Sequence, residues 1–161
     1  MPTVQDYFNA ERQGGLLLIA MAVAGVSLAA YLWSTRNAFL AMAWPLVLLG
    51  VLQVAIGSTV AWRASGQASS LEQGLRESPG PTATAELERM NTVNRTFRGI
   101  KIAEVAIIVL SLALVLGFPQ PGQWSAVGLG LLVEAAALLA FDVFAHHRAL
   151  VYTEWLQKIP H

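Results

Sequence analysis

One carboxyl group of this sequence lies deep inside an apolar stretch. Glu134 is about ten residues past Trp124, where the stretch begins, which is roughly 15 Å along a helix. An acidic side chain near the middle of a bilayer is costly unless it is protonated, paired or facing water. Its plausible partners by depth are Ser111 and Gln53. Glu134 is then either the proton or cation site of a transporter or channel, or a hydrogen-bonded link that fixes helix packing.

A second group of charged side chains lies at the ends of two apolar stretches. Glu104 follows Lys101 by about one helical turn, and Asp142 precedes His146 by about one turn. Because the two stretches would run antiparallel, both carboxyl groups should reach about the same depth at the cytoplasmic edge. We therefore predict a salt-bridge network made by Lys101, Glu104, Asp142, His146 and Arg148.

Asp142 and His146 share one helical face, and their spacing is also acceptable for two metal ligands. Two ligands do not make a site, and a third would have to come from Glu104, His147 or His161. Nucleophilic catalysis has no support, because the serines of the apolar stretches have no histidine base at their depth. We expect no metal, no cofactor and no enzymatic activity.

The composition is typical of a membrane protein. Of the 161 residues, 55% are hydrophobic and 12% are charged, whereas soluble globular domains have about 25% charged residues. The chain has no cysteine, which excludes disulfides, thiolate metal sites and cysteine nucleophiles. We expect a single domain whose surroundings are the lipid bilayer, with no nucleic-acid partner.

Four apolar stretches are long enough to cross a bilayer as helices. They cover residues 14–33, 39–62, 99–118 and 124–145, and about 20 residues at 1.5 Å each span a hydrocarbon core of about 30 Å. Membrane-spanning strands would alternate apolar and polar residues, and these stretches do not. The fold class predicted is all-α, a four-transmembrane-helix bundle whose first span is retained rather than removed as a signal peptide.

The distribution of Lys and Arg predicts the orientation. Arg36 alone lies in a loop on one side of the spans. The other side holds nine basic residues: Arg12, Arg63, Arg76, Arg89, Arg95, Arg98, Lys101, Arg148 and Lys158. Because basic residues are retained on the cytoplasmic face, both termini and the central loop are predicted to be cytoplasmic, in a bacterial inner membrane.

The central segment 63–98 is predicted to extend the second and third spans as a cytoplasmic helical hairpin. Apolar residues recur at helical spacing along both arms, Ser78-Pro-Gly-Pro81 predicts the turn between them, and Thr84 is placed to cap the second arm. The second arm carries an apolar stripe, which is either covered by the other arm and the terminal helices or docks a partner or a second copy. This possible docking face consists of Leu87, Met90 and Phe97.

Both terminal segments are predicted to lie along the membrane interface. Residues 1–13 combine apolar and charged side chains, as a short interfacial helix would, before the chain turns into the membrane at Gly14-Gly15. Residues 146–161 continue the fourth span along the interface in the same way.

Taken together, these features favour a small protein that acts through protein–protein interaction. It would be an accessory subunit, an assembly factor or an immunity-type protein that binds a membrane-targeting toxin. The alternative is a homo-oligomeric transporter or channel that uses Glu134. An enzyme is the third class, because the polar residues do not converge on one catalytic site.

Overall fold

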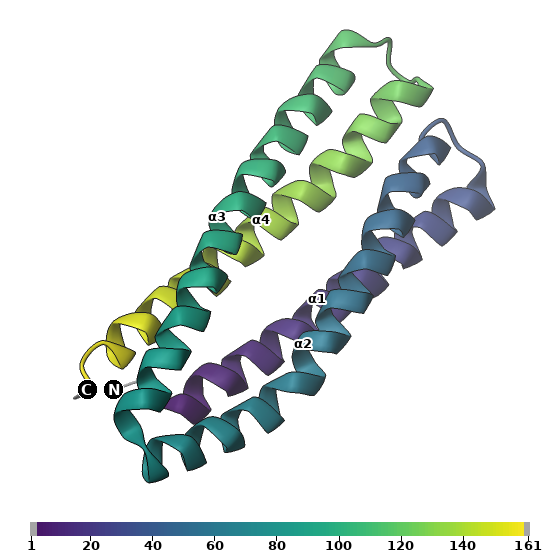
Figure 1. The fold of residues 1–161 in the computed structure, drawn as a ribbon. Coiled ribbons are helices and arrows are strands. Elements are labelled where there is room, and N and C mark those ends of the chain that lie inside the picture. The colour runs from purple at the N-terminus through teal and green to yellow at the C-terminus, as the bar shows by residue number, and fades with distance from the viewer. Residues whose placement is uncertain (1–2, 160–161) are drawn as a thin grey trace.

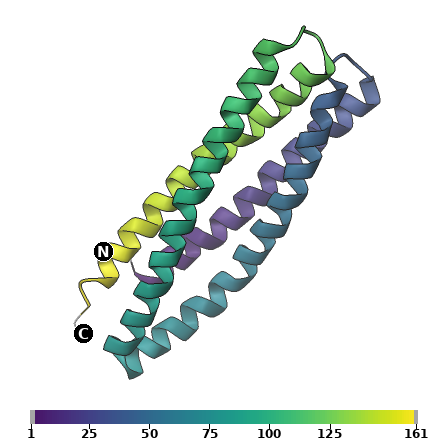
Figure 2. The same ribbon diagram turned by 45° about the horizontal axis from the view of Figure 1, so that its top comes forward.

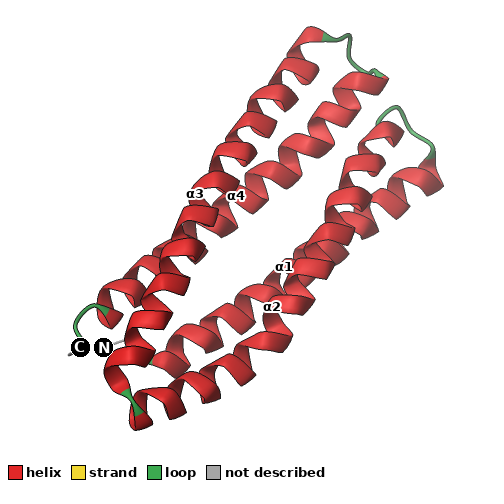
Figure 3. Cartoon of the chain, in the orientation of Figure 1, coloured by secondary structure: helices red, strands yellow, loops and turns green. Residues whose placement is uncertain are grey.

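The computed structural model describes residues 3–159, which fold into four long α-helices and one short 3-10 helix (Figure 3). Each long helix contains a segment apolar enough to cross a membrane, so the prediction of an all-helical chain with four candidate spans is confirmed. The helices are α1 (Val4–Thr35), η1 (Leu40–Met42), α2 (Ala43–Glu77), α3 (Pro79–Gly117) and α4 (Gln123–Leu156).

The long helices pair as two antiparallel hairpins, α1 with α2 and α3 with α4 (Figures 1 and 2). Both chain ends lie at one end of the bundle, together with Ser78, where α2 passes into α3. We call this the terminal end. The opposite end, here called the loop end, holds the connections α1–α2 and α3–α4.

The first helix is continuous, which differs from the predicted turn at Gly14-Gly15. Thr3 caps α1 by accepting a hydrogen bond from the Asp6 backbone N–H at 3.1 Å, and Asp6 accepts one from the Thr3 backbone N–H at 3.0 Å. Both glycines are buried inside the helix. A Cβ at Gly15 would lie 2.6 Å from the carbonyl oxygen of Gly57, so this glycine lets α1 and α2 approach closely rather than turn the chain.

The connection between α2 and α3 is also shorter than predicted. Ser78 alone interrupts the helices, and α3 begins at Pro79. A proline at the first helical position loses nothing, because the backbone N–H there has no partner inside a helix. Thr84 is therefore inside α3 rather than at its cap, and its hydroxyl donates to the Gly80 carbonyl oxygen at 3.0 Å.

Side chains of all four helices form a core at the terminal end. The rings of Tyr7 and Tyr152 stack with centroids 4.1 Å apart, and Phe8 packs edge-on to both. Met90 is fully buried in the same core. The core joins the two hairpins at this end and includes α4, which runs without a break through residues 146–156.

Tryptophans mark the two boundaries of a possible membrane-spanning region. Trp33 and Trp44 pack edge-to-face near the loop end, with ring centroids 6.0 Å apart. Trp62 is 87% exposed further along α2. At 1.5 Å per residue, Trp44 and Trp62 are about 27 Å apart along the helix axis, which is close to the thickness of a hydrocarbon core.

Candidate functional site

The carboxyl group of Glu134 meets an amide from the other hairpin. Gln53 of α2 donates from Nε2 to Oε2 of Glu134 on α4 at 2.6 Å. The two side chains are only 2% and 5% exposed, respectively. The other carboxyl oxygen lies against α1, because a Cβ added to Gly25 would be 2.6 Å from it. Three helices therefore converge on one polar group.

Of the two predicted partners of Glu134, Gln53 bonds to it and Ser111 does not. Gln53 is confirmed, and a hydrogen bond to a buried carboxyl group offsets part of its desolvation cost. Ser111 is wrong as a partner, since its hydroxyl donates to the Ile107 carbonyl oxygen of its own helix at 2.6 Å. Ser111 instead lies where α3 touches α4, and a Cβ at Gly128 would come within 2.9 Å of its carbonyl oxygen.

A cavity of about 440 Å³ separates the hairpins, and all four long helices contribute to its wall. Most of the lining side chains are apolar. Several of them are also exposed on the outside of the bundle, including Leu52 and Ile56 of α2 and Ile100 of α3. The cavity therefore opens sideways between α2 and α3. Its polar wall residues are Glu11, Gln53, Glu104, Asp142 and Arg148.

The predicted charge cluster is only partly assembled as expected. Lys101 Nζ lies 2.7 Å from Nδ1 of His146, whereas Glu104 and Asp142 both lie in the wall of the cavity. The expected network of ion pairs is wrong, because the only ion pair within residues 3–159 is elsewhere. Glu104 and Asp142 turn toward the cavity, and this leaves the ammonium group of Lys101 to the imidazole.

The surroundings of the His146 imidazole favour its neutral form. Burial lowers the pKa of His146, and the charges of Lys101 and Arg98 lower it further. A neutral ring can accept a hydrogen bond at Nδ1 from the ammonium group of Lys101. The ring also stacks on Phe97, with centroids 5.3 Å apart.

The last member of the predicted cluster, Arg148, lies at the terminal end of the cavity. A Cβ at Gly14 would be 3.2 Å from its Nη2 atom. Glu11 lines the same part of the wall. Burial raises the pKa of Glu11, and the positive charges of Arg89, Arg63 and Arg148 oppose that shift. Nothing in the sequence pattern marks Glu11 except its place beside the first apolar stretch.

The predicted docking face is occupied within the chain. Met90 is fully buried, and Leu87 and Phe97 pack against the core formed by α1 and α4. A partly buried ion pair borders this region, because Arg89 donates from Nε and Nη2 to the two carboxyl oxygens of Glu86, both at 2.7 Å. In this arrangement the terminal helices cover this face, and its use by a partner stays a prediction.

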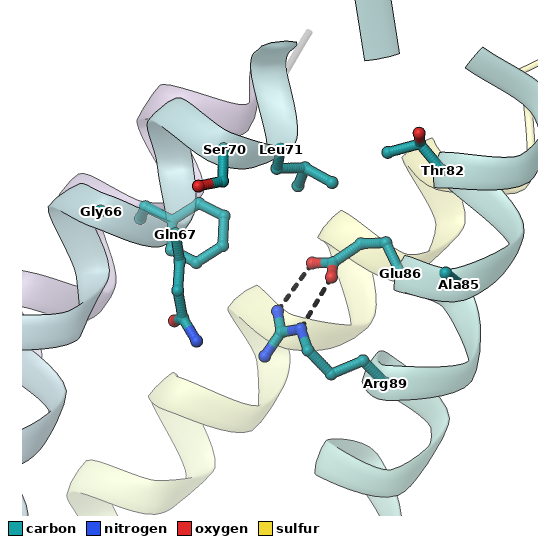
Figure 4. Close-up of a pocket in the computed structure, with 9 residues that line it drawn as sticks. Gly66, Gln67, Ser70, Leu71, Thr82, Ala85, Glu86 and Arg89 are labelled. Atoms are coloured by element: carbon teal, nitrogen blue, oxygen red, sulfur yellow. Dashed lines mark hydrogen bonds and ion pairs between the residues drawn. The ribbon is translucent and has the colours of Figure 1, made fainter. Parts of the chain in front are cut away.

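A second cavity of about 470 Å³ lies beside this ion pair, between α2 and α3 (Figure 4). Figure 4 shows the guanidinium group of Arg89 against the carboxyl group of Glu86, with Gln67 and Ser70 on the facing helix. The hydroxyl of Tyr152 donates to Glu86 Oε1 at 3.3 Å, and the guanidinium carbon of Arg89 lies 5.8 Å from the ring centroid of Phe8. Nothing in the sequence pattern singles out this pair.

Metal ligation has no geometric support in the described part of the chain. No group of three His, Cys, Asp or Glu side chains within residues 3–159 is placed to hold a metal ion. His161, a candidate third ligand in the sequence, lies outside the described residues.

Comparison of the whole chain with protein-family models, with curated proteins and with solved structures gives no match. The features that bear on function are the Glu134–Gln53 pair and the Glu86–Arg89 pair, each with the cavity beside it.

Proposed function

We propose that this chain is a membrane transporter or channel in which Glu134 is the intramembrane group that binds and releases a proton or a cation. The observation that carries the proposal is the 2.6 Å hydrogen bond between Glu134 and Gln53, because Gln53 also lines the cavity between the hairpins. A buried ionisable group beside such a cavity is the arrangement expected of a proton or ion path.

The cavity would connect this pair to the terminal end of the bundle. Glu104 and Asp142 are further along its wall, followed by Glu11 and Arg148. Each of the three acids can accept a proton or attract a cation, whereas the guanidinium group of Arg148 stays positive. Titratable groups therefore follow one another from the terminal end toward Glu134.

The proposal includes an orientation. The terminal end carries nine basic residues, whereas the loop end carries Arg36 alone. The terminal end would therefore face the cytoplasm, with the protein in a bacterial inner membrane. In that orientation the end of α2 after Trp62 and the first part of α3 would project into the cytoplasm as the helical hairpin predicted from the sequence. The cavity would then receive protons from the cytoplasmic side.

Flux through purified protein in liposomes tests this function. An imposed pH or potential gradient is expected to drive proton or cation movement, read with an internal pH-sensitive dye and with cation-selective electrodes. Glu134→Gln should abolish the flux because the amide keeps the shape but cannot exchange a proton. Glu88→Gln is the matched control, since Glu88 is exposed and lines neither cavity. Equal flux through both variants would refute the proposal.

A second candidate is the protein–protein interaction favoured by the sequence, in an accessory subunit, an assembly factor or an immunity-type protein. With the face around Met90 occupied, a partner would use the membrane-facing side instead. The observation that favours it is the sideways opening, where exposed apolar side chains such as Leu52 and Ile100 border the cavity. A helix of a partner or of a second copy would cover them.

The absence of cysteine makes this candidate easy to test. Single variants Leu52→Cys and Ile100→Cys should crosslink in membranes to a partner or to a second copy, whereas Leu116→Cys, on an exposed part of α3 near the loop end, should not. Crosslinking of all three variants alike would show random collision and exclude the specific interface.

A further inference from the structure

The cavity between the hairpins carries an excess of negative groups. The charged residues in its wall are three acids, Glu11, Glu104 and Asp142, and one base, Arg148. Lys101 does not line the cavity and is engaged with His146. Even with one proton shared between Glu104 and Asp142, the wall attracts a cation more strongly than an anion.

Three buried oxygen atoms of residues in this wall lack a hydrogen-bond donor, and one of them is Oε2 of Glu11. The other two are Oε2 of Glu104 and Oε1 of Gln53, whose residues are only 6% and 2% exposed. Buried acceptors are normally satisfied, because an unmatched one costs about 1–3 kcal/mol. A molecule in the cavity that carries hydrogen-bond donors would satisfy such acceptors.

The remainder of the cavity is suited to an apolar chain. Its volume of about 440 Å³ is in the range of small-molecule sites. Leu52, Ile56 and Ile100 line it and are also exposed between α2 and α3. An amphiphile dissolved in the bilayer would enter there without crossing water.

We propose that the cavity binds a primary alkyl amine from the bilayer, with its ammonium group at Glu104 and Asp142 and its alkyl chain along the apolar wall. An ammonium group supplies both the positive charge and the N–H donors that the wall lacks. The inference deepens the proposed function, because it names the class of cation that would be carried. Binding itself needs no flux.

The exchange at the carboxyl pair balances in charge. Two carboxyl groups in one buried wall repel each other when both are ionised, which favours one proton held by the pair. When the ammonium group of the amine takes that place, the proton leaves to the aqueous phase at the terminal end. One positive charge replaces another, and no bond of the amine is made or broken.

Radiolabelled dodecylamine provides the test, with the purified full-length chain in lipid nanodiscs and empty nanodiscs as the correction for partitioning. We expect saturable binding of one dodecylamine per chain. Glu104→Gln should weaken it at least tenfold, and Glu88→Gln should leave it unchanged. Ala103→Trp, which fills the cavity from α3 without changing its charge, should also abolish binding. Circular dichroism and gel filtration of each variant establish that it is folded.

Three outcomes would overturn the inference. Binding no greater than that of empty nanodiscs excludes the site. Equal competition by dodecanol shows that only the alkyl chain is recognised, and a copurified phospholipid that dodecylamine cannot displace shows that the cavity belongs to lipid. Amine binding without Glu134-dependent flux refutes the proposed function alone, whereas Glu134-dependent flux without amine binding refutes this inference alone.

Discussion

Replacing Gly15 with alanine tests the closest contact between α1 and α2. The added Cβ would lie 2.6 Å from the Gly57 carbonyl oxygen and 2.9 Å from the Ala61 backbone nitrogen. Ordinary contacts of a Cβ begin at 3.4 Å, so the helices must part by about 0.8 Å. Because both neighbours are backbone atoms, no side-chain rotation relieves the clash. Overpacking of this kind costs about 1–3 kcal/mol.

Gly66→Ala is the matched control, because nothing lies within 4 Å of the Cβ it would add. Both glycines are inside helices, so alanine gains about 0.5–1 kcal/mol of helix propensity at each. Subtracting the two effects leaves the packing cost alone. We expect Gly66→Ala to be neutral or stabilising and Gly15→Ala to be less stable than it by about 1–3 kcal/mol.

The assay is reversible unfolding in mixed micelles, titrated with sodium dodecyl sulfate and followed by circular dichroism. Gly57→Ala should act in the same direction as Gly15→Ala, since its Cβ would meet the Gly15 carbonyl oxygen at 2.5 Å. The double variant should lose less than the sum, because either substitution already separates the helices. Equal unfolding free energies for Gly15→Ala and Gly66→Ala would refute the close contact between α1 and α2 and would favour the turn predicted from the sequence at Gly14-Gly15.

The remaining predictions concern the terminal end. Tyr152→Phe keeps the ring stack but removes the 3.3 Å hydrogen bond to Glu86, so unfolding free energy should fall by about 0.5–1.5 kcal/mol; Tyr152→Ala should cost about 3–5 kcal/mol because the buried ring is lost, and equal losses would contradict the stacking. Arg89→Met removes the two Arg89 donors from the buried carboxyl group of Glu86 and should destabilise the chain. The double variant Glu86→Gln with Arg89→Met should restore part of that loss in the same unfolding assay. His146 has a lowered pKa, so its contribution to stability is complete above its ordinary value near 6.5 and is lost as pH falls through the folded-state pKa; the stability difference between the native chain and His146→Gln should shrink from pH 7.5 to pH 5, and a constant difference would show that folding does not change the pKa of this imidazole.

The positions of the helices could be predicted from the sequence because apolar length is a local property. The same holds for the depth of Glu134 and Gln53, which follows from counting residues along each helix. Ser111 lies at a matching depth, but its hydroxyl group bonds to its own helix instead of to Glu134. Which way a side chain points depends on the rotation of its helix against its neighbours, and hydropathy alone does not specify that rotation.

Other differences come from residues whose meaning depends on a distant partner. A pair such as Gly14-Gly15 suits both a turn and a close helix contact, and only the position of Gly57 decides between them. Met90 marks an apolar stripe from the sequence alone. Whether the stripe is free depends on how far α1 and α4 extend, and both extend far enough to cover it.

The order of the helices along the chain has a consequence for biosynthesis. The hairpin of α1 and α2 leaves the ribosome first, with the amide of Gln53 on its inner face, and α4 with Glu134 follows last. Until the second hairpin joins the first, neither polar side chain has the hydrogen bond that lowers its cost in the bilayer. The pair therefore forms only when all four helices are in place, so that a chain lacking its last helix would leave the amide of Gln53 without this partner in the bilayer.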